Sequence, residues 1–253
     1  MDLETLKSAL DFSGRHVLVV GGSSGIGNAT AHAFRTCGAA VHVTGTRKSA
    51  SEYSPNDISD FTGLTYSQLD FTDPEGFRNW TPPIHRLDAL VMCQALAFFK
   101  GEEFEPGVFR DVVDVNLTSM FDCAERFRPL LSESRGAIVI VSSLAAFRTI
   151  PYQPAYTASK SALLGLVRAL STTYIREGVR VNGIAPGLAK TKLGRDAHPD
   201  YDTLIDKTVR RIPMKRTADL CEMAGPILYL CSPLSSYVIG QTLIVDGGMS
   251  LTS

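Results

Sequence analysis

Short segments, most of them apolar and rich in β-branched residues, recur along the chain, and longer mixed segments separate them. The runs lie at residues 15–20, 38–44, 64–69, 87–92, 137–141, 179–184 and 243–248. Segments of helix-forming composition lie at 28–37, 105–131, 155–174 and 217–231. Because fully apolar strands are typical of parallel sheets covered by helices, this alternation predicts an α/β fold. We expect a single-domain Rossmann fold over residues 1–253, with a doubly wound parallel β-sheet of about seven strands and helices on both faces.

The composition narrows the class of protein. The 253 residues carry a formal net charge of −1, which argues against nucleic-acid binding, and no apolar run approaches the ~18–20 residues of a membrane span. Residues 1–7 carry acids and no apolar core, so we expect no secretory signal. The five cysteines are scattered, as is typical of free thiols in the cytoplasm. The histidines are scattered too, so no metal site is predicted.

A glycine-rich turn joins the first apolar run to the first helical segment. It reads Gly21-Gly22-Ser23-Ser24-Gly25-Ile26-Gly27. Glycines let the backbone turn tightly and approach a pyrophosphate, and the N-terminus of the following helix offers it free N–H groups. A plain turn is the alternative, but the order strand, glycine turn, helix favours nucleotide binding.

Three side chains with complementary acid–base chemistry surround a later loop. Ser143 follows the run at 137–141, Tyr156 lies in the first turn of the expected helix, and Lys160 lies four residues on, on the same helical face. An ammonium beside a phenol favours the phenolate, so we expect Lys160 to lower the pKa of Tyr156. A serine hydroxyl nearby can bind the same substrate oxygen, and the set predicts interconversion of C=O and CH–OH. Taken alone, Tyr156 and Lys160 also fit an ordinary pair on a solvated helix.

With the glycine turn, this spacing of Ser143, Tyr156 and Lys160 resembles the active site of the short-chain dehydrogenase/reductase family. The resemblance runs from about Arg15 to Gly248. It implies an NAD(P)-dependent oxidoreductase in which Tyr156 is the acid and base and Ser143 orients the substrate carbonyl. It also implies that Lys160 holds the nicotinamide ribose.

The resemblance implies further contacts at the ends of other strands. Asp70 would hydrogen-bond the adenine, with a helix cap as the alternative reading, and Asn116 would hold a water that connects Lys160 to solvent. Residues 188–215 resemble the family's mobile substrate lid. The cofactor-binding set that we expect is Gly21, Ser23, Ser24, Gly25, Ile26, Gly27, Thr46, Arg47, Asp70, Phe71, Ala95, Tyr156, Lys160, Pro186, Gly187 and Thr191.

One segment departs from the family pattern. Met92-Cys93-Gln94-Ala95 stands where the family usually has Asn-Asn-Ala-Gly. The change removes asparagine side chains that would help tie the sheet, and it places a Cβ at Ala95, where glycine lets the ribose approach. This departure is the support for one alternative, a non-catalytic dinucleotide-binding regulatory protein.

The end of the second apolar run bears on the choice of cofactor. Gly45 stands where NAD-selective members carry an aspartate, and Thr46, Arg47 and Lys48 follow it. An acid here favours NAD, whereas a nearby arginine accommodates the 2′-phosphate of NADP. We therefore expect NADP(H), with NAD(H) possible. The alternative is that Arg47 and Lys48 form a solvated pair.

The expected partners are a small-molecule carbonyl or alcohol substrate and further copies of this chain. The family resemblance implies a homotetramer, with neither nucleic acid nor membrane as a partner. The loop residues Ala145, Phe147, Ile150 and Gln153 are expected to line the substrate pocket. A narrower alternative is a 3-oxoacyl carrier-protein reductase, whose acidic partner would need a basic surface. The available cations are Arg126, Arg128, Arg135 and Arg148.

Overall fold

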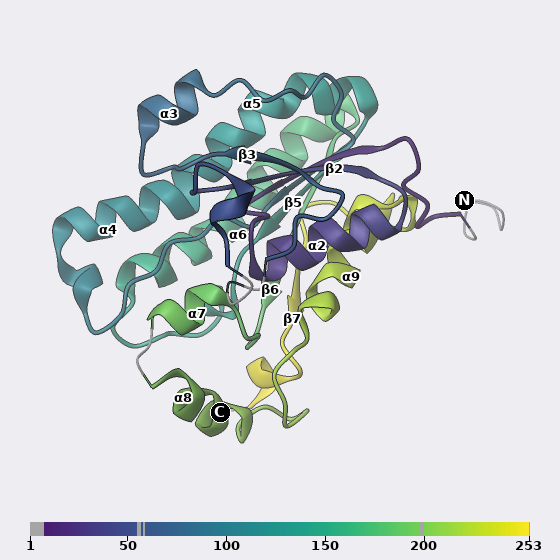
Figure 1. Cartoon of the computed structure of the whole chain (residues 1–253). Coiled ribbons are helices and arrows are strands. Elements are labelled where there is room, and N and C mark those ends of the chain that lie inside the picture. Colours follow the sequence, from purple (N-terminus) through teal and green to yellow (C-terminus); the bar gives the residue numbers. More distant parts are fainter. Residues whose placement is uncertain (1–7, 55–56, 58, 198–199, 253) are drawn as a thin grey trace.

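The computed structural model describes residues 8–54, 57, 59–197 and 200–252, and their seven strands form one parallel sheet in the order β3-β2-β1-β4-β5-β6-β7 (Figure 1). The strands are β1 (His16–Val20), β2 (Ala40–Gly45), β3 (Thr65–Gln68), β4 (Ala89–Met92), β5 (Ala137–Val141), β6 (Arg180–Pro186) and β7 (Thr242–Val245). Each expected run overlaps one of them. The strand order reverses between β1 and β4, where doubly wound sheets bind their ligands. The predicted fold class is confirmed.

Helices connect the strands and cover both faces of the sheet (Figure 1). The α-helices are α2 (Gly25–Thr36), α3 (Pro74–Asn79), α4 (Pro106–Val113), α5 (Ser119–Ser134), α6 (Pro154–Tyr174), α7 (Lys192–Ala197), α8 (Tyr201–Val209) and α9 (Leu220–Cys231). Short 3₁₀ helices lie at Ala50–Glu52, Glu102–Phe104, Leu144–Ala146, Ile175–Glu177, Pro233–Ser235 and Met249–Leu251. The helix expected at 105–131 is α4 and α5, joined by a π-helical turn at Asp114–Thr118. Such turns are frequent at functional sites.

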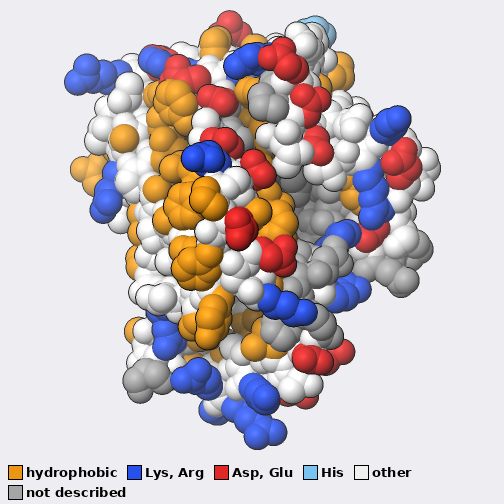
Figure 2. Space-filling view, turned by 90° about the vertical axis from the view of Figure 1, so that its left-hand side faces the viewer, with side chains coloured by type: hydrophobic (Ala, Val, Ile, Leu, Met, Phe, Trp, Pro, Cys, Tyr) orange, Lys and Arg blue, Asp and Glu red, His pale blue; other side chains and the backbone are white. Residues whose placement is uncertain are grey.

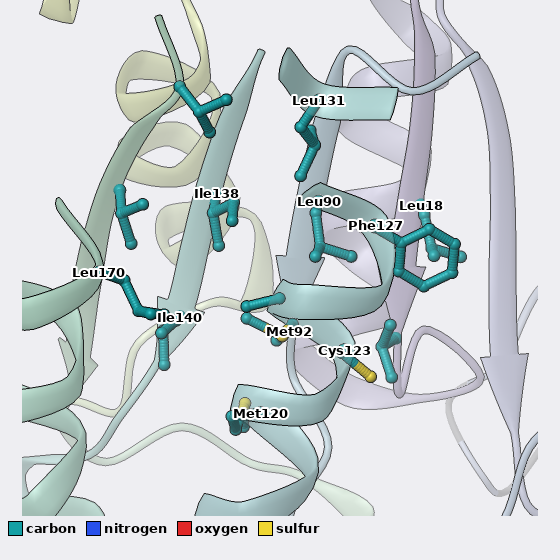
Figure 3. Packing of buried hydrophobic residues seen from close by; sticks show 14 of the residues in the cluster. Leu18, Leu90, Met92, Met120, Cys123, Phe127, Leu131, Ile138, Ile140 and Leu170 are labelled. Atoms are coloured by element: carbon teal, nitrogen blue, oxygen red, sulfur yellow. The ribbon is translucent and has the colours of Figure 1, made fainter. Parts of the chain in front are cut away.

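Successive residues of each strand point to opposite faces, so β1 contributes to two cores. Leu18 and Val20 pack with the buried faces of α5 and α6, whereas Val17 and Val19 pack with α2 and α9. Figure 3 shows the first core, in which Leu90 and Ile138 of neighbouring strands meet side chains of α5. Truncating one such fully buried leucine to alanine typically costs ~2–5 kcal/mol, so these cores hold the strand ends in place.

A buried carboxylate anchors the start of the sheet. Asp88, just before β4, accepts hydrogen bonds from the His16 N–H at 2.9 Å and from the guanidinium groups of Arg15 and Arg86, each at 2.9 Å. Burial alone would raise the pKa of Asp88, but these hydrogen bonds outweigh it and lower the pKa to about 2.

Two expectations lie partly outside the described residues. The expected lack of a secretory signal rests on residues 1–7, which lie outside the described ranges. Residues 198–199 of the expected lid also lie outside them. The described parts of the segment 188–215 contain α7 and α8, which lie below the sheet in Figure 1. None of the helices in the described ranges is both long and apolar enough for a membrane crossing.

Candidate active site

A cavity of about 670 Å³ opens where the carboxyl ends of the strands meet. This volume lies within the usual range for small-molecule sites, ~300–1,000 Å³. All sixteen expected cofactor-binding residues line the cavity, and so does Ser143. Asn116 is not among its lining residues. Segments far apart in sequence therefore converge on one site.

The glycine turn passes so close to its neighbours that side chains would not fit. A Cβ on Gly21, whose φ is +71°, would lie 2.7 Å from the backbone nitrogen of Gln94. A Cβ on Gly27 would lie 2.3 Å from the Gly21 carbonyl oxygen. The N-cap residue of α2, Ser24, makes no side-chain capping hydrogen bond. The backbone N–H groups at this helix start therefore remain for an anionic ligand, and the turn fits a dinucleotide pyrophosphate.

Tyr156, Ser143 and Lys160 converge within the cavity. Tyr156 lies in the first turn of α6, as expected, and its phenol is hydrogen-bonded to the Ser143 side chain. The Lys160 ammonium is buried and lies 5.7 Å from the centre of the Tyr156 ring, where it donates to the Val141 carbonyl at 3.1 Å. The end of β5 and the first turns of α6 thus fix all three groups.

One expectation about this trio is wrong. We expected Lys160 to lower the pKa of Tyr156, but burial raises it, opposed by the hydrogen bond with Ser143. Burial lowers the pKa of Lys160 to about 8. The physical reason is that both groups are withdrawn from water, and the Lys160 N–H bond is directed at the Val141 carbonyl. A phenol with a raised pKa is protonated at neutral pH and therefore holds a proton that it can donate.

Asn116 lies in the π-helical turn and is fully buried. Its amide oxygen accepts from the Leu96 N–H at 2.7 Å, and its amide nitrogen donates to the Leu96 carbonyl at 2.8 Å and to Ser159 Oγ at 3.2 Å. Ser159 Oγ in turn donates to the Tyr156 carbonyl at 2.8 Å. Asn116 therefore holds the loop after β4 against α6, and the expected water relay stays a prediction.

The start of α3 bears on the two readings of Asp70. Asp73, not Asp70, caps α3, because its carboxylate accepts from the Gly76 N–H at 3.0 Å. Asp70 instead accepts from the backbone and the hydroxyl of Thr72, at 2.9 and 2.7 Å, and faces the cavity. Asp70 therefore does not cap α3, and its contact with the adenine stays a prediction.

Arg47 is held over the end of β2 by several contacts. Its guanidinium lies 4.4 Å from the centre of the Tyr53 ring and donates to Asp57 at 2.7 Å and to the Glu52 carbonyl. A Cβ on Gly45 would lie 2.3 Å from the Tyr53 hydroxyl, so an aspartate does not fit there with Tyr53 in place. This end of the cavity therefore presents a cation and no carboxylate at the position that selects NAD.

One wall of the cavity was not predicted from the sequence. Leu96, Ala97, Phe98 and Phe99 line it, as does Glu102. Of the residues expected there, Phe147 and Ile150 are exposed, whereas Ala145 and Gln153 are buried elsewhere, and none of the four lines the cavity. The apolar stretch after β4 was visible in the sequence, but no local pattern showed that it turns into the pocket.

The departure at residues 92–95 has a structural account. Met92 belongs to the core, and the Gln94 amide donates to Ser119 Oγ at 3.1 Å, which ties β4 to α5. Cys93 lines the cavity, and burial raises the pKa of its thiol to about 12. These contacts replace the sheet ties expected of asparagine, and Ala95 still faces the cavity.

Comparison with known proteins agrees with this geometry. A family model described as Enoyl-(Acyl carrier protein) reductase matches residues 20–250. The chain belongs to the short-chain dehydrogenase/reductase family. Members of this family act on alcohol and carbonyl groups with a nicotinamide dinucleotide, and this chain is an oxidoreductase of that type.

Similar proteins of this short-chain dehydrogenase/reductase family carry several names. The chain is 31% identical over 244 residues to the 3-oxoacyl-[acyl-carrier-protein] reductase FabG of Chlamydia muridarum, covering 92% of this chain and 96% of the relative. It is 31% identical over 253 residues to 2-dehydro-3-deoxy-D-gluconate 5-dehydrogenase of Bacillus subtilis, covering 96% and 97%. A crystal structure from Beutenbergia cavernae, described as an NAD(P) dependent gluconate 5-dehydrogenase with NADP bound at low occupancy, is 32% identical with a TM-score of 0.84 and covers 96% and 100%. These names differ in substrate, so family membership alone does not choose one.

Proposed function

We propose that this short-chain dehydrogenase/reductase is an NADPH-dependent reductase of an uncharged, largely apolar carbonyl compound, with Tyr156 as proton donor. The observation that carries the proposal is the convergence of Ser143, Tyr156 and Lys160 with the glycine turn and Arg47 in one cavity. The two halves of the reaction, nucleotide binding and proton transfer, then share a single site.

A bound NADPH would supply the hydride for the carbonyl carbon. Ser143 and Tyr156 donate hydrogen bonds to the carbonyl oxygen, and Tyr156 then gives it a proton. Because burial raises the pKa of Tyr156, the phenol holds that proton at neutral pH. Lys160 keeps its charge below its pKa of about 8, and its ammonium would bind the ribose hydroxyls of the cofactor. Gly21–Gly27 and Thr191 would hold the diphosphate of the cofactor.

The preference for NADPH rests on the end of β2. Arg47 is already oriented by Tyr53 and Asp57, and a guanidinium can grip a phosphate with two hydrogen bonds. The lack of room for an acid at Gly45 removes the usual partner of the NAD ribose. The related structure from Beutenbergia cavernae, which contains NADP, agrees with this assignment.

The apolar wall of the cavity favours an uncharged substrate. Leu96, Ala97, Phe98 and Phe99 provide apolar and aromatic surface, and Glu102 adds a carboxylate. An anionic sugar acid would be repelled by the Glu102 carboxylate. An apolar ketone or aldehyde would instead bury its surface against the phenylalanines.

A second candidate, reduction of a 3-oxoacyl group on a carrier protein, is supported by the similarity to FabG of Chlamydia muridarum. Two of the four arginines considered for carrier docking argue against this candidate. Arg126 donates to the carbonyls of Phe77 and Trp80, and Arg128 pairs with Glu177. Those guanidinium groups are engaged within the fold and are not free for an acidic partner.

We also propose that the chain forms a homotetramer in the cytoplasm. Figure 2 shows a band of hydrophobic side chains down the face on which α4 lies. Exposed aromatic residues on and beside α4 and α5 include Phe104, Phe109 and Phe121, which are 67%, 38% and 46% exposed. Large exposed apolar patches are typical of protein interfaces. The five free cysteines support a reducing compartment. Light scattering that gave a monomer mass at micromolar concentration would contradict the assembly.

The test of the function is a hydride-transfer assay over a panel of carbonyl and alcohol compounds with both nucleotides. The panel should contain aliphatic and aromatic ketones, sugar acids and a 3-oxoacyl thioester with and without its carrier. We expect turnover of the uncharged ketones with NADPH. Nucleotide binding without turnover of any compound would favour the non-catalytic alternative, and turnover of the carrier-bound thioester alone would favour the second candidate.

A further inference from the structure

A buried carboxylate links the pocket wall to the catalytic helix. Glu103 is fully buried in the short helix Glu102–Phe104, just before α4. One carboxylate oxygen accepts from the Phe98 N–H at 3.2 Å, and the other accepts from the Tyr156 N–H at 2.9 Å. Among the described residues no lysine, arginine or histidine forms an ion pair with it. Both oxygens are thus directed at the backbone of the site.

The start of α6 explains why a carboxylate suits this place. The first N–H groups of a helix have no partner within the helix, and the N-cap side chain usually satisfies one of them. The N-cap residue of α6, Gln153, makes no capping hydrogen bond. Glu103 caps the helix from another part of the chain, and its negative charge is favourable at the positive end of the helix dipole.

The same contacts fix the pocket wall. Gln153 donates from its side chain to the Phe98 carbonyl at 3.0 Å, while Glu103 accepts the N–H of that residue. Asn116 binds both the N–H and the carbonyl of Leu96. Three buried side chains therefore hold the backbone of the wall at residues 96–98, and Glu103 is the one that also holds Tyr156.

We propose that Glu103 is a positioning residue that sets the distance between the substrate wall at Leu96–Phe99 and the phenol of Tyr156. It touches neither substrate nor cofactor and acts through the backbone of Phe98 and Tyr156. This inference rests on the proposed reductase function, which it extends to a residue outside the cavity lining.

Glu103 also has an electrostatic consequence. Its charge is one of the influences that raise the pKa of Tyr156, after burial. Lys160 on α6 and Ser143 after β5 lie beside the Tyr156 ring and phenol, and Cys93 after β4 and the carboxylate of Glu102 line the same cavity. Removal of the Glu103 charge therefore lowers the pKa of Tyr156, whereas shortening the side chain with its charge kept does not.

The experiment compares Glu103→Gln, Glu103→Asp and a matched control, Glu105→Gln, which removes the same charge from an exposed position two residues away. In Glu103→Gln the amide nitrogen faces an N–H group, so one hydrogen bond is lost. We expect kcat/KM to fall about ten- to a hundredfold, as for small misplacements of reacting groups, with the nucleotide Kd within about twofold of wild type. The pH at which reduction is lost on the alkaline side should move downward in Glu103→Gln and stay in place in Glu103→Asp.

A second measurement does not depend on turnover. Amide hydrogen exchange at Phe98 and Tyr156 should accelerate in both Glu103 variants and not in Glu105→Gln. Wild-type rates, pH profile and exchange in Glu103→Gln would overturn the proposal; if that variant does not fold, unchanged rate and exchange in Glu103→Asp would do so. Absence of turnover in the wild type would sink the proposed function, and the exchange measurement would still decide whether Glu103 holds the wall.

Discussion

Replacing Arg47 with alanine tests the cofactor assignment most sharply. Hydrogen bonds between a charged donor and a phosphate contribute ~1.5–3 kcal/mol, which is a factor of about 10 to 150 in affinity. The Arg47 guanidinium already pairs with Asp57 at 2.7 Å and is about one-third exposed. Weakening of this pair on phosphate binding, together with solvent screening, reduces the net contribution of Arg47 to NADPH affinity. We therefore expect Arg47→Ala to lower the preference for NADPH over NADH about ten- to thirtyfold.

The assay is kcat/KM for both nucleotides with one substrate, supported by the Kd of each oxidised nucleotide. Lys48→Ala is the matched control, because Lys48 is an exposed neighbouring cation outside the cavity lining. It should change the preference by less than about twofold, the range for a screened surface charge. A wild type that prefers NADH, or an Arg47→Ala enzyme with an unchanged preference, would refute the reasoning.

Two further predictions concern buried charges. Lys160→Ala should lower turnover and weaken nucleotide binding, because the ammonium that contacts the end of β5 is lost. The check is the nucleotide Kd by titration below pH 8, where the wild-type lysine is charged. Equal Kd values for variant and wild type would show that Lys160 does not hold the cofactor. Asp88 has a pKa depressed from 3.8 to about 2, so its contribution of roughly 2 kcal/mol is present above pH 4 and is lost as the pH falls toward 2. In Asp88→Asn the free energy of unfolding should be lower at pH 7 and less dependent on pH between 4 and 2 in denaturant titrations; an unchanged pH dependence would contradict this.

The periodicity of the sequence was sufficient for the sheet. Most of the strands appear as largely apolar runs, as is typical of parallel strands buried on both faces, and each predicted run overlaps a strand. The glycine turn, Tyr156 and Lys160 could be located because their chemistry depends on local spacing. Strand ends then brought them together, since the carboxyl ends of parallel strands meet at one edge.

Longer-range features could not be read from the sequence. The contact between Glu103 and the Tyr156 N–H spans 53 residues, and nothing near Glu103 marks it as a helix cap. The raised pKa of Tyr156 depends on burial and on where the Lys160 ammonium is directed, which spacing alone does not determine. The pocket wall at Leu96–Phe99 was missed because its direction is set by Asn116, Gln153 and Glu103.

The measurement that tests the central claim most directly is turnover by Tyr156→Phe beside nucleotide binding by the same variant. The change removes only the phenolic hydroxyl, so the cavity and the glycine turn are kept. We predict that reduction with NADPH falls at least a thousandfold, because loss of a positioned proton donor typically costs about a hundred- to ten-thousandfold. The Kd for NADP should stay within about twofold of the wild-type value. A variant that keeps a tenth of the wild-type rate would show that another group supplies the proton, and the account of this site would be wrong.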